Sequence, residues 1–203
     1  MILATHPAKT VTAADVPVSR LDNDSLIVRL HYTVNHLSRW ITPVHNRALL
    51  ERSVFFGEPS VKQLLFDLRD EELRIFPKIH LIGTQANPDL DQLPPVSRTP
   101  QEGRWESFAS ALSVMAEFRR LRQSTLSLLR SLPNTAWQRT GTSRVEHDWV
   151  LRDLAEVLAN HDVQVLRRID QTLDTIGARE GLSPAARTHL DDLLRLTPVT
   201  LRS

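Results

Sequence analysis

An apolar stripe with helical spacing constrains this chain more than any other feature of its sequence. In residues 61–82 the stripe positions recur at steps of three or four residues, the period of one face of an α-helix. Ser60 is a suitable N-cap, Pro77 predicts a kink or local break, and Gly83 is a natural end. The segment therefore predicts a long amphipathic helix. Its stripe is apolar except at one position and comprises Val61, Leu65, Leu68, Glu72, Ile75, Ile79 and Ile82.

Three further segments have the same period. The first begins at Asp24 or Ser25, both suitable N-caps, and runs to Ile41. Another starts at Trp105 and continues through Leu129, and the last runs from about residue 149 to residue 176. Almost no alternating pattern typical of a strand is present. Four long amphipathic helices predict an all-α fold, a four-helix bundle.

The remaining segments predict the organisation around this bundle. Residues 84–103 contain four prolines and no period, so we expect a long crossover loop that is either functional or mobile. Residues 1–21 have no helical stripe and predict an extended arm. A short C-terminal helix is expected from Ser183, with Pro184 in its first turn. The predicted organisation is an arm over 1–21 and one bundle domain over 22–203.

Composition limits the classes of function. The chain has 25 basic and 24 acidic residues, a net charge of +1, which provides no general field for a polyanion. We therefore expect no nucleic acid partner. The basic clusters "FRRLR" (118–122) and "LRRID" (166–170) lie inside helical patterns and predict solvated helix faces. The chain has no cysteine, so any metal must be held by His, Asp or Glu.

Neither a membrane segment nor a secretory signal is predicted. The apolar runs are too short to span a bilayer, and the start "MILATHPAK" has no basic segment leading into an apolar stretch. These features predict a cytoplasmic protein that contacts no membrane. There is also no G-x-S-x-G elbow, H-E-x-x-H pair or phosphate-binding glycine loop, so no catalytic residue is assigned.

His161 lies on the apolar stripe of the last long segment. A histidine there is either a packed core residue or a metal ligand. Two histidines four residues apart on a helix project from one face and can hold a single ion. Here the residue four positions later is Val165, so only half of such a pair is present. The residues alone leave both interpretations of His161 open.

Three segments together resemble the DinB-like superfamily of helical-bundle proteins, over roughly residues 22–176. "LRQSTLSLLRSLPNTAWQRTG" contains the spacing of Leu132, Pro133, Trp137 and Gly141. "HDWVLRDLAEVLANHDVQVLRRID" follows it, with a His-Asp pair on its helix, and "SVKQLLFDLRDEE" (60–72) is similar to the second helix of that family. The order and spacing of these segments make the resemblance fairly specific.

The resemblance implies a divalent metal site that is incomplete in this chain. Members of the family typically bind a divalent metal through three histidines, one on the second helix and two, four residues apart, on the fourth; an aspartate is also a permissible ligand for zinc, nickel or manganese. The three histidine positions fall on Asp67, His161 and Val165. Asp67 and His161 are therefore the predicted metal residues, whereas valine cannot coordinate an ion. We expect either no cofactor or a weakly bound divalent metal.

Other histidines are weaker candidates for the site. His31, His36 and His80 lie off the centre of their stripes, and His147 precedes the last long helix, where it is expected near the mouth of a pocket. Surface placement is expected for the remaining histidines, and the four tryptophans are expected to pack within the bundle.

The sequence leaves three functions open. The favoured one is a stress-related or small-ligand-binding role, in a bundle that keeps a pocket between its helices but has lost its metal site. The alternative is a metal-dependent thiol transferase, isomerase or hydrolase that uses Asp67 and His161. The third is an interaction module, because bundle proteins of this kind often form homodimers.

Overall fold

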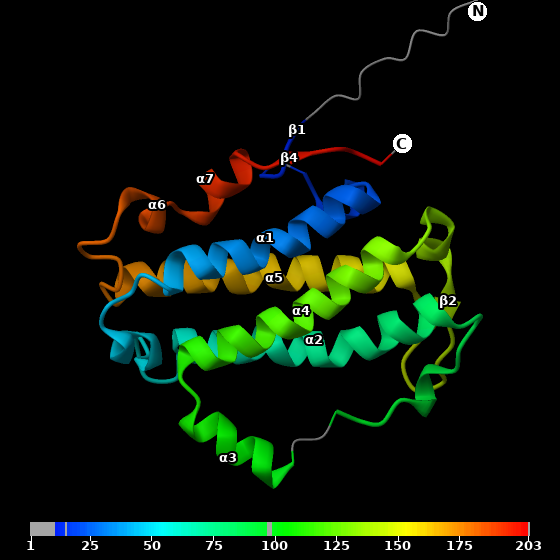
Figure 1. Ribbon diagram of the computed structural model, residues 1–203, viewed down its shortest axis with the longest axis horizontal. Helices are drawn as coiled ribbons and strands as arrows, with labels where there is room; N and C mark the ends of the chain where they lie inside the picture. The colour runs from blue at the N-terminus through cyan, green and yellow to red at the C-terminus, as the bar shows by residue number, and fades with distance from the viewer. Residues whose placement is uncertain (1–10, 15, 97–98, 203) are drawn as a thin grey trace, which may run out of the picture.

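The computed structural model describes residues 11–14, 16–96 and 99–202, which form a bundle of four long helices (Figure 1). Helix α2 packs against α4 and α5, and α1 packs against the same two helices, so α1 and α2 lie diagonally across the bundle. The predicted all-α, four-helix class is therefore confirmed. The four helices are α1 (Asn23–Ile41), α2 (Val61–Thr84), α4 (Ala111–Ser131) and α5 (Leu151–Thr175).

The helix starts follow from side chains that cap free backbone N–H groups. Ser60 caps α2 as predicted, and the Gln63 side-chain oxygen accepts a 2.7 Å hydrogen bond from the Ser60 N–H, which completes a capping box. Helix α1 begins earlier than predicted. Its N-cap is Asp22, whose carboxylate accepts a 2.8 Å hydrogen bond from the Ser25 N–H, so neither Asp24 nor Ser25 is the cap.

Pro77 does not break α2. The helix continues through the proline and ends at Thr84, one residue past the predicted end at Gly83. A proline in a helix removes one N–H donor and crowds the preceding turn. Here Ile75 and Ile79 on either side of it are fully buried, and this packing keeps the helix in place.

The helix predicted from Trp105 to Leu129 is two helices. Helix α3 (Pro100–Phe108) is capped by Thr99, and α4 starts anew at Ser110, whose hydroxyl accepts from the Ser113 N–H. Between them Ala109 has an extended backbone. The apolar period continues across this break, which explains why the sequence pattern did not reveal it. Helix α3 contains no buried residue and lies outside the bundle, below α2 and α4 in Figure 1.

The segment after α5 also divides. In place of one C-terminal helix from Ser183, the chain forms α6 (Pro184–Arg187) and α7 (Leu190–Arg195), with Thr188 extended between them. Four 3-10 turns occupy other connections within the described ranges. They are η1 (Val18–Arg20), η2 (Arg47–Glu51), η3 (Leu90–Gln92) and η4 (Asn134–Gln138).

Two short antiparallel strand pairs lie among the described residues, and the first of them joins distant parts of the chain. Strand β1 (Val11–Thr12) pairs with β4 (Pro198–Val199), and β2 (Thr140–Gly141) pairs with β3 (Trp149–Val150). The described part of the predicted arm therefore lies against the C-terminal segment (Figure 1). Residues 1–10 and 15 of the arm are outside the described residues, and the division into 1–21 and 22–203 stays a prediction.

A central polar layer divides the apolar core into two clusters. It consists of Thr33, Glu72, Arg122, Thr125 and Asp162, each at most 2% exposed. On every long helix, the residues before and after the layer belong to different apolar clusters. Because these polar groups are removed from water, their hydrogen bonds must be made inside the protein.

Arg122 makes most of these bonds. Its Nε donates to Glu72 at 2.8 Å, its Nη2 donates to Asp162 at 3.0 Å, and Thr33 donates to the same carboxylate at 2.7 Å. Burial disfavours the charged guanidinium, but the carboxylates of Asp162 and Glu72 outweigh that effect and raise the pKa of Arg122. The layer thus joins all four helices around a charged arginine.

The predicted solvated face of "FRRLR" is wrong for Arg122 and correct for its neighbours. Arg119 and Arg120 are exposed, as are Arg167 and Arg168 of the second cluster. Arg122 differs because Glu72 and Asp162 face it from the neighbouring helices and balance its charge.

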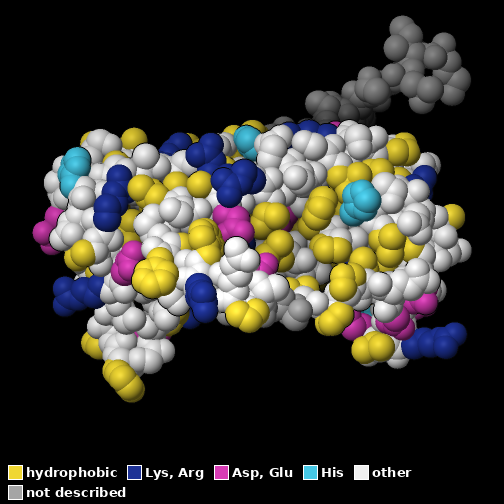
Figure 2. Space-filling model, turned by 60° about the horizontal axis from the view of Figure 1, so that its bottom comes forward, with side chains coloured by type: hydrophobic (Ala, Val, Ile, Leu, Met, Phe, Trp, Pro, Cys, Tyr) yellow, Lys and Arg dark blue, Asp and Glu magenta, His cyan; other side chains and the backbone are white. Residues whose placement is uncertain are grey.

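The charged residues that remain outside are mixed in sign. On the face drawn in Figure 2, Lys and Arg side chains lie among Asp, Glu and hydrophobic ones. Among the helices of the described residues, none is long and apolar enough to cross a membrane.

Candidate functional site

A pocket of about 720 Å³ is lined by both predicted site residues. Asp67 comes from α2 and His161 comes from α5. Helix α3 contributes Trp105 and Glu106, and α4 contributes Glu117. The pocket therefore takes residues from three bundle helices and from the short helix that precedes α4.

Asp67 is a carboxylate without a close counter-ion among the described residues. Its side chain is 49% exposed, and its ion pair with Arg168 has an N–O distance of 3.9 Å. Burial of the other half raises the pKa of the Asp67 carboxyl, while nearby Arg168 and His161 oppose the rise. Its oxygen atoms are thus available to a ligand in the pocket.

His161 is partly exposed on the pocket wall. Its Nδ1 is buried and has no hydrogen-bond partner within the described part of the chain. One turn later, Val165 is only 4% exposed and packs in an apolar cluster of the core. The position that the resemblance assigned to a third ligand is therefore occupied by ordinary packing.

These residues do not fit a three-ligand metal site. Across residues 11–14, 16–96 and 99–202, a single group of three His, Asp or Glu side chains has ligand atoms close enough to share an ion, and it contains neither Asp67 nor His161. A catalytic zinc is usually held by three protein ligands and keeps one position open. Asp67 and His161 could supply at most two of them.

The other histidines do not complete the set. His31 lines a separate groove between α1 and α4, and His80 is exposed. His36 is 4% exposed and its ring is stacked between Tyr32 and Trp40 on α1. None of them is among the residues that line the pocket, nor is His147, whose ring lies against Trp149.

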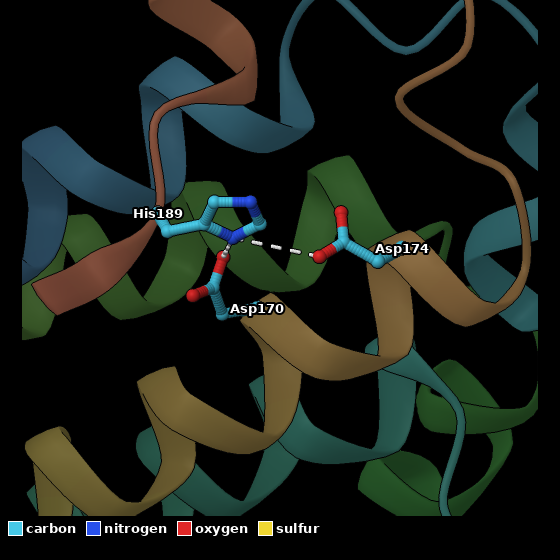
Figure 3. Close-up of side chains that lie close together, drawn as sticks. All are labelled: Asp170, Asp174 and His189. Carbon is cyan, nitrogen blue, oxygen red and sulfur yellow. Dashed lines mark ion pairs between the residues drawn. The ribbon is translucent and has the colours of Figure 1, made fainter. Parts of the chain in front are cut away.

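The three side chains whose ligand atoms lie close enough to share an ion are those of Asp170, Asp174 and His189, shown in Figure 3. The His189 Nδ1 lies 3.4 Å from Asp170 and 3.5 Å from Asp174. However, Arg179 already neutralises these carboxylates, with hydrogen bonds of 2.5 Å to Asp170 and 2.8 Å to Asp174. The backbone N–H of Leu190 also donates to Asp170, so the group fastens α7 to α5.

Sequence reasoning missed this group. His189 is 55% exposed, in agreement with its predicted surface placement, but its acidic neighbours were not anticipated. The four-residue spacing of Asp170 and Asp174 puts them on one face of α5 and was the available signal. No local sequence pattern predicts that Arg179 and His189 contact these two carboxylates.

Arg69 builds the pocket wall and was also missed. Its guanidinium donates to Asp70 at 2.6 Å and to Glu106 of α3. It lies 4.7 Å from the ring centre of Phe66 and 5.7 Å from that of Trp105. Because α3 has no buried residue, this contact with α2 holds Trp105 and Glu106 beside Asp67.

The helical arrangement and the site region match known proteins. The sequence profile of the DinB superfamily matches residues 30–169, more than half of the chain. One similar solved structure is YfiT from Bacillus subtilis, described as a probable metal-dependent hydrolase with an unusual four-helix bundle topology. The two share 18% identity with a TM-score of 0.61, over 76% of this chain and 87% of that one. A comparison with curated proteins found no match.

The fold and the pocket thus define a four-helix bundle protein with a pocket between its helices. More particularly, the chain belongs to the DinB superfamily. The likeness to YfiT concerns the fold, since the sequence identity is low.

Proposed function

We propose that this DinB-superfamily protein binds a small molecule in the pocket walled by Asp67 and His161, and that it holds a divalent metal weakly or not at all. The burial of Val165, one turn after His161, carries this proposal. A ligand position filled by a packed apolar side chain stabilises the bundle but contributes nothing to coordination.

The two remaining groups are poor anchors for an ion. Each protein ligand that is lost removes a large part of the free energy of metal binding, because water must then complete the coordination of the ion. Zinc, nickel or manganese would therefore exchange readily. The pocket keeps a carboxylate and an imidazole that can hydrogen-bond to an organic ligand.

The alternative is a metal-dependent thiol transferase, isomerase or hydrolase that uses Asp67 and His161. It is supported by their shared pocket and by the description of YfiT as a probable metal-dependent hydrolase. It requires an ion held firmly enough to keep an open position for a reacting group. Firm retention of metal therefore separates the two functions.

Elemental analysis of protein purified without a histidine tag tests the proposal. We expect much less than one zinc, nickel or manganese per chain. Near one metal per chain, lost in His161→Ala but kept in His189→Ala, would contradict the proposal and favour the metal-dependent enzyme. Loss of the metal in His189→Ala but not in His161→Ala would place the ion at Asp170, Asp174 and His189, and would leave the pocket free of metal as proposed.

The biological setting and the assembly stay predictions. A stress-related role, a cytoplasmic location and a homodimer are compatible with the bundle but are not required by the pocket. Light scattering on purified protein measures the oligomeric state directly.

A further inference from the structure

We propose that the ligand of this pocket is a small organic cation with an apolar body. The inference rests on the proposed small-molecule role and assigns the chemical class of the ligand. It depends on Asp67 and Glu117, two loosely paired carboxylates, and on the partly exposed ring of Trp105.

Acidic groups predominate on the described wall of the pocket. Six carboxylates line it, compared with the three guanidinium groups of Arg69, Arg74 and Arg120. Several of these charges pair with each other, for example Arg74 with Glu71 at 2.5 Å. The acidic side chains are Asp67, Asp70, Glu71, Glu102, Glu106 and Glu117.

Two of the carboxylates have ion pairs that are too long to be hydrogen bonds. Asp67 lies 3.9 Å from Arg168, and Glu117 lies 3.6 Å from Arg69. A charge-assisted hydrogen bond between nitrogen and oxygen is about 2.7–2.9 Å long. Arg168 is as exposed as Asp67, at 49%, and exposed pairs of this kind contribute little. An ammonium group of a ligand can therefore replace Arg168 at small cost and donate directly to Asp67.

The same wall already holds one cation of the protein. The guanidinium of Arg69 lies near the rings of both Phe66 and Trp105 and donates to acidic side chains. Aromatic faces attract cations because of their quadrupole, and carboxylates add direct charge. Trp105 is 39% exposed, so part of its surface is open to a ligand.

An apolar body suits the rest of the wall. Leu73 and Val96 line the same pocket, and Val96 is 63% exposed. Covering such surface removes apolar area from water and favours binding. A ligand with a positive head and a hydrocarbon or aromatic body uses both kinds of surface.

Three compounds of similar shape and different charge test the ligand class. Phenethylamine is a cation, 2-phenylethanol is neutral and phenylacetate is an anion. Each is titrated into tag-free protein labelled with ¹⁵N, and the indole N–H signal of Trp105 is followed after its assignment with Trp105→Phe. We expect the amine to bind about tenfold more tightly than the alcohol, and the anion to bind most weakly.

Matched variants locate the positive group. Asp67→Asn should lower the affinity for the amine about tenfold and leave that for the alcohol within about twofold, because only the amine uses the charge. Arg168→Ala should raise the affinity for the amine about threefold, because it removes the competing cation. Arg167→Ala is the control: it removes the same charge from the adjacent position, where the ion pair is with Asp191. We expect no change.

The outcomes separate this inference from the proposed function. If the alcohol or the anion binds at Trp105 as tightly as the amine, the cationic class is overturned while the small-molecule pocket stands. If Arg167→Ala and Arg168→Ala have equal effects, the attraction comes from net charge and the assignment to Asp67 is overturned. If none of the three compounds gives a saturable shift, both the class and the pocket proposal are overturned.

Discussion

Replacement of Arg122 by methionine should destabilise the bundle strongly. The change removes hydrogen bonds from the guanidinium to Glu72, to both oxygens of Asp162 and to the Leu30 carbonyl. It leaves two carboxylates buried, with the hydroxyls of Thr33 and Thr125 as donors to them. Removal of one partner of a buried ion pair costs about 3–5 kcal/mol, because the remaining charge is uncompensated.

Urea unfolding followed by circular dichroism measures this loss, with thermal melting as a second assay. For a chain of this size, 3–5 kcal/mol lowers the melting temperature by roughly 6–20 °C. Arg120→Met is the matched control, since Arg120 lies on the same helix and is exposed, and we expect a change within about 0.5 kcal/mol. A triple variant, Arg122→Met with Glu72→Met and Asp162→Leu, should be more stable than the single variant, because no charge remains buried. A loss below about 1 kcal/mol in Arg122→Met, within the range of an exposed ion pair, would refute this account of the polar layer.

Two further predictions concern pH and packing. Burial, reinforced by Arg39 and Arg29, lowers the pKa of His36 to about 4 from its usual 6.5. The unfolded chain therefore binds the proton more readily, so stability should fall by about 3 kcal/mol as the pH decreases from 6.5 to 4. In His36→Leu the free energy of unfolding should no longer show this fall between pH 6.5 and 4. An unchanged pH dependence in that variant would contradict the assignment to His36. A Cβ at Gly141 would lie 2.8 Å from Ile82 and 2.9 Å from Leu90, so Gly141→Ala should cost roughly 1–3 kcal/mol. Gly103→Ala, which meets nothing within 4 Å, should cost nothing, and equal losses in both variants would contradict the packing argument.

The parts of the fold that follow from helical period were predictable. The four long helices have continuous apolar stripes, and their burial follows directly from that pattern. The break at Ala109 was not predictable, because the period continues through it and the capping hydroxyl of Ser110 is a common residue type. The pairing of β1 with β4 involves two residues on each side, too few for an alternating pattern.

The candidate site was predictable in part, for a different reason. The resemblance to a family placed Asp67 and His161 on α2 and α5, and both line the same pocket in the structure. The burial of Arg122 could not be derived from "FRRLR", since its neutralising partners come from other helices. A single polar residue in the α2 stripe, Glu72, was the one signal of the central polar layer. The wall formed by α3 depends on Arg69 reaching Glu106 across a long connection, which no local pattern encodes.

The pocket is proposed to lack a metal ligand at Val165, and a zinc titration of Val165→His tests this proposal. The new imidazole would lie one turn from His161 on the same face of α5. Isothermal titration of tag-free protein should give weak zinc binding to the wild type and a gain of at least about tenfold, or 1.4 kcal/mol, in Val165→His. Circular dichroism checks that the variant is folded, and the gain should vanish when His161→Ala is added. Tight, stoichiometric zinc binding by the wild type, or no gain in a folded Val165→His, would contradict the claim.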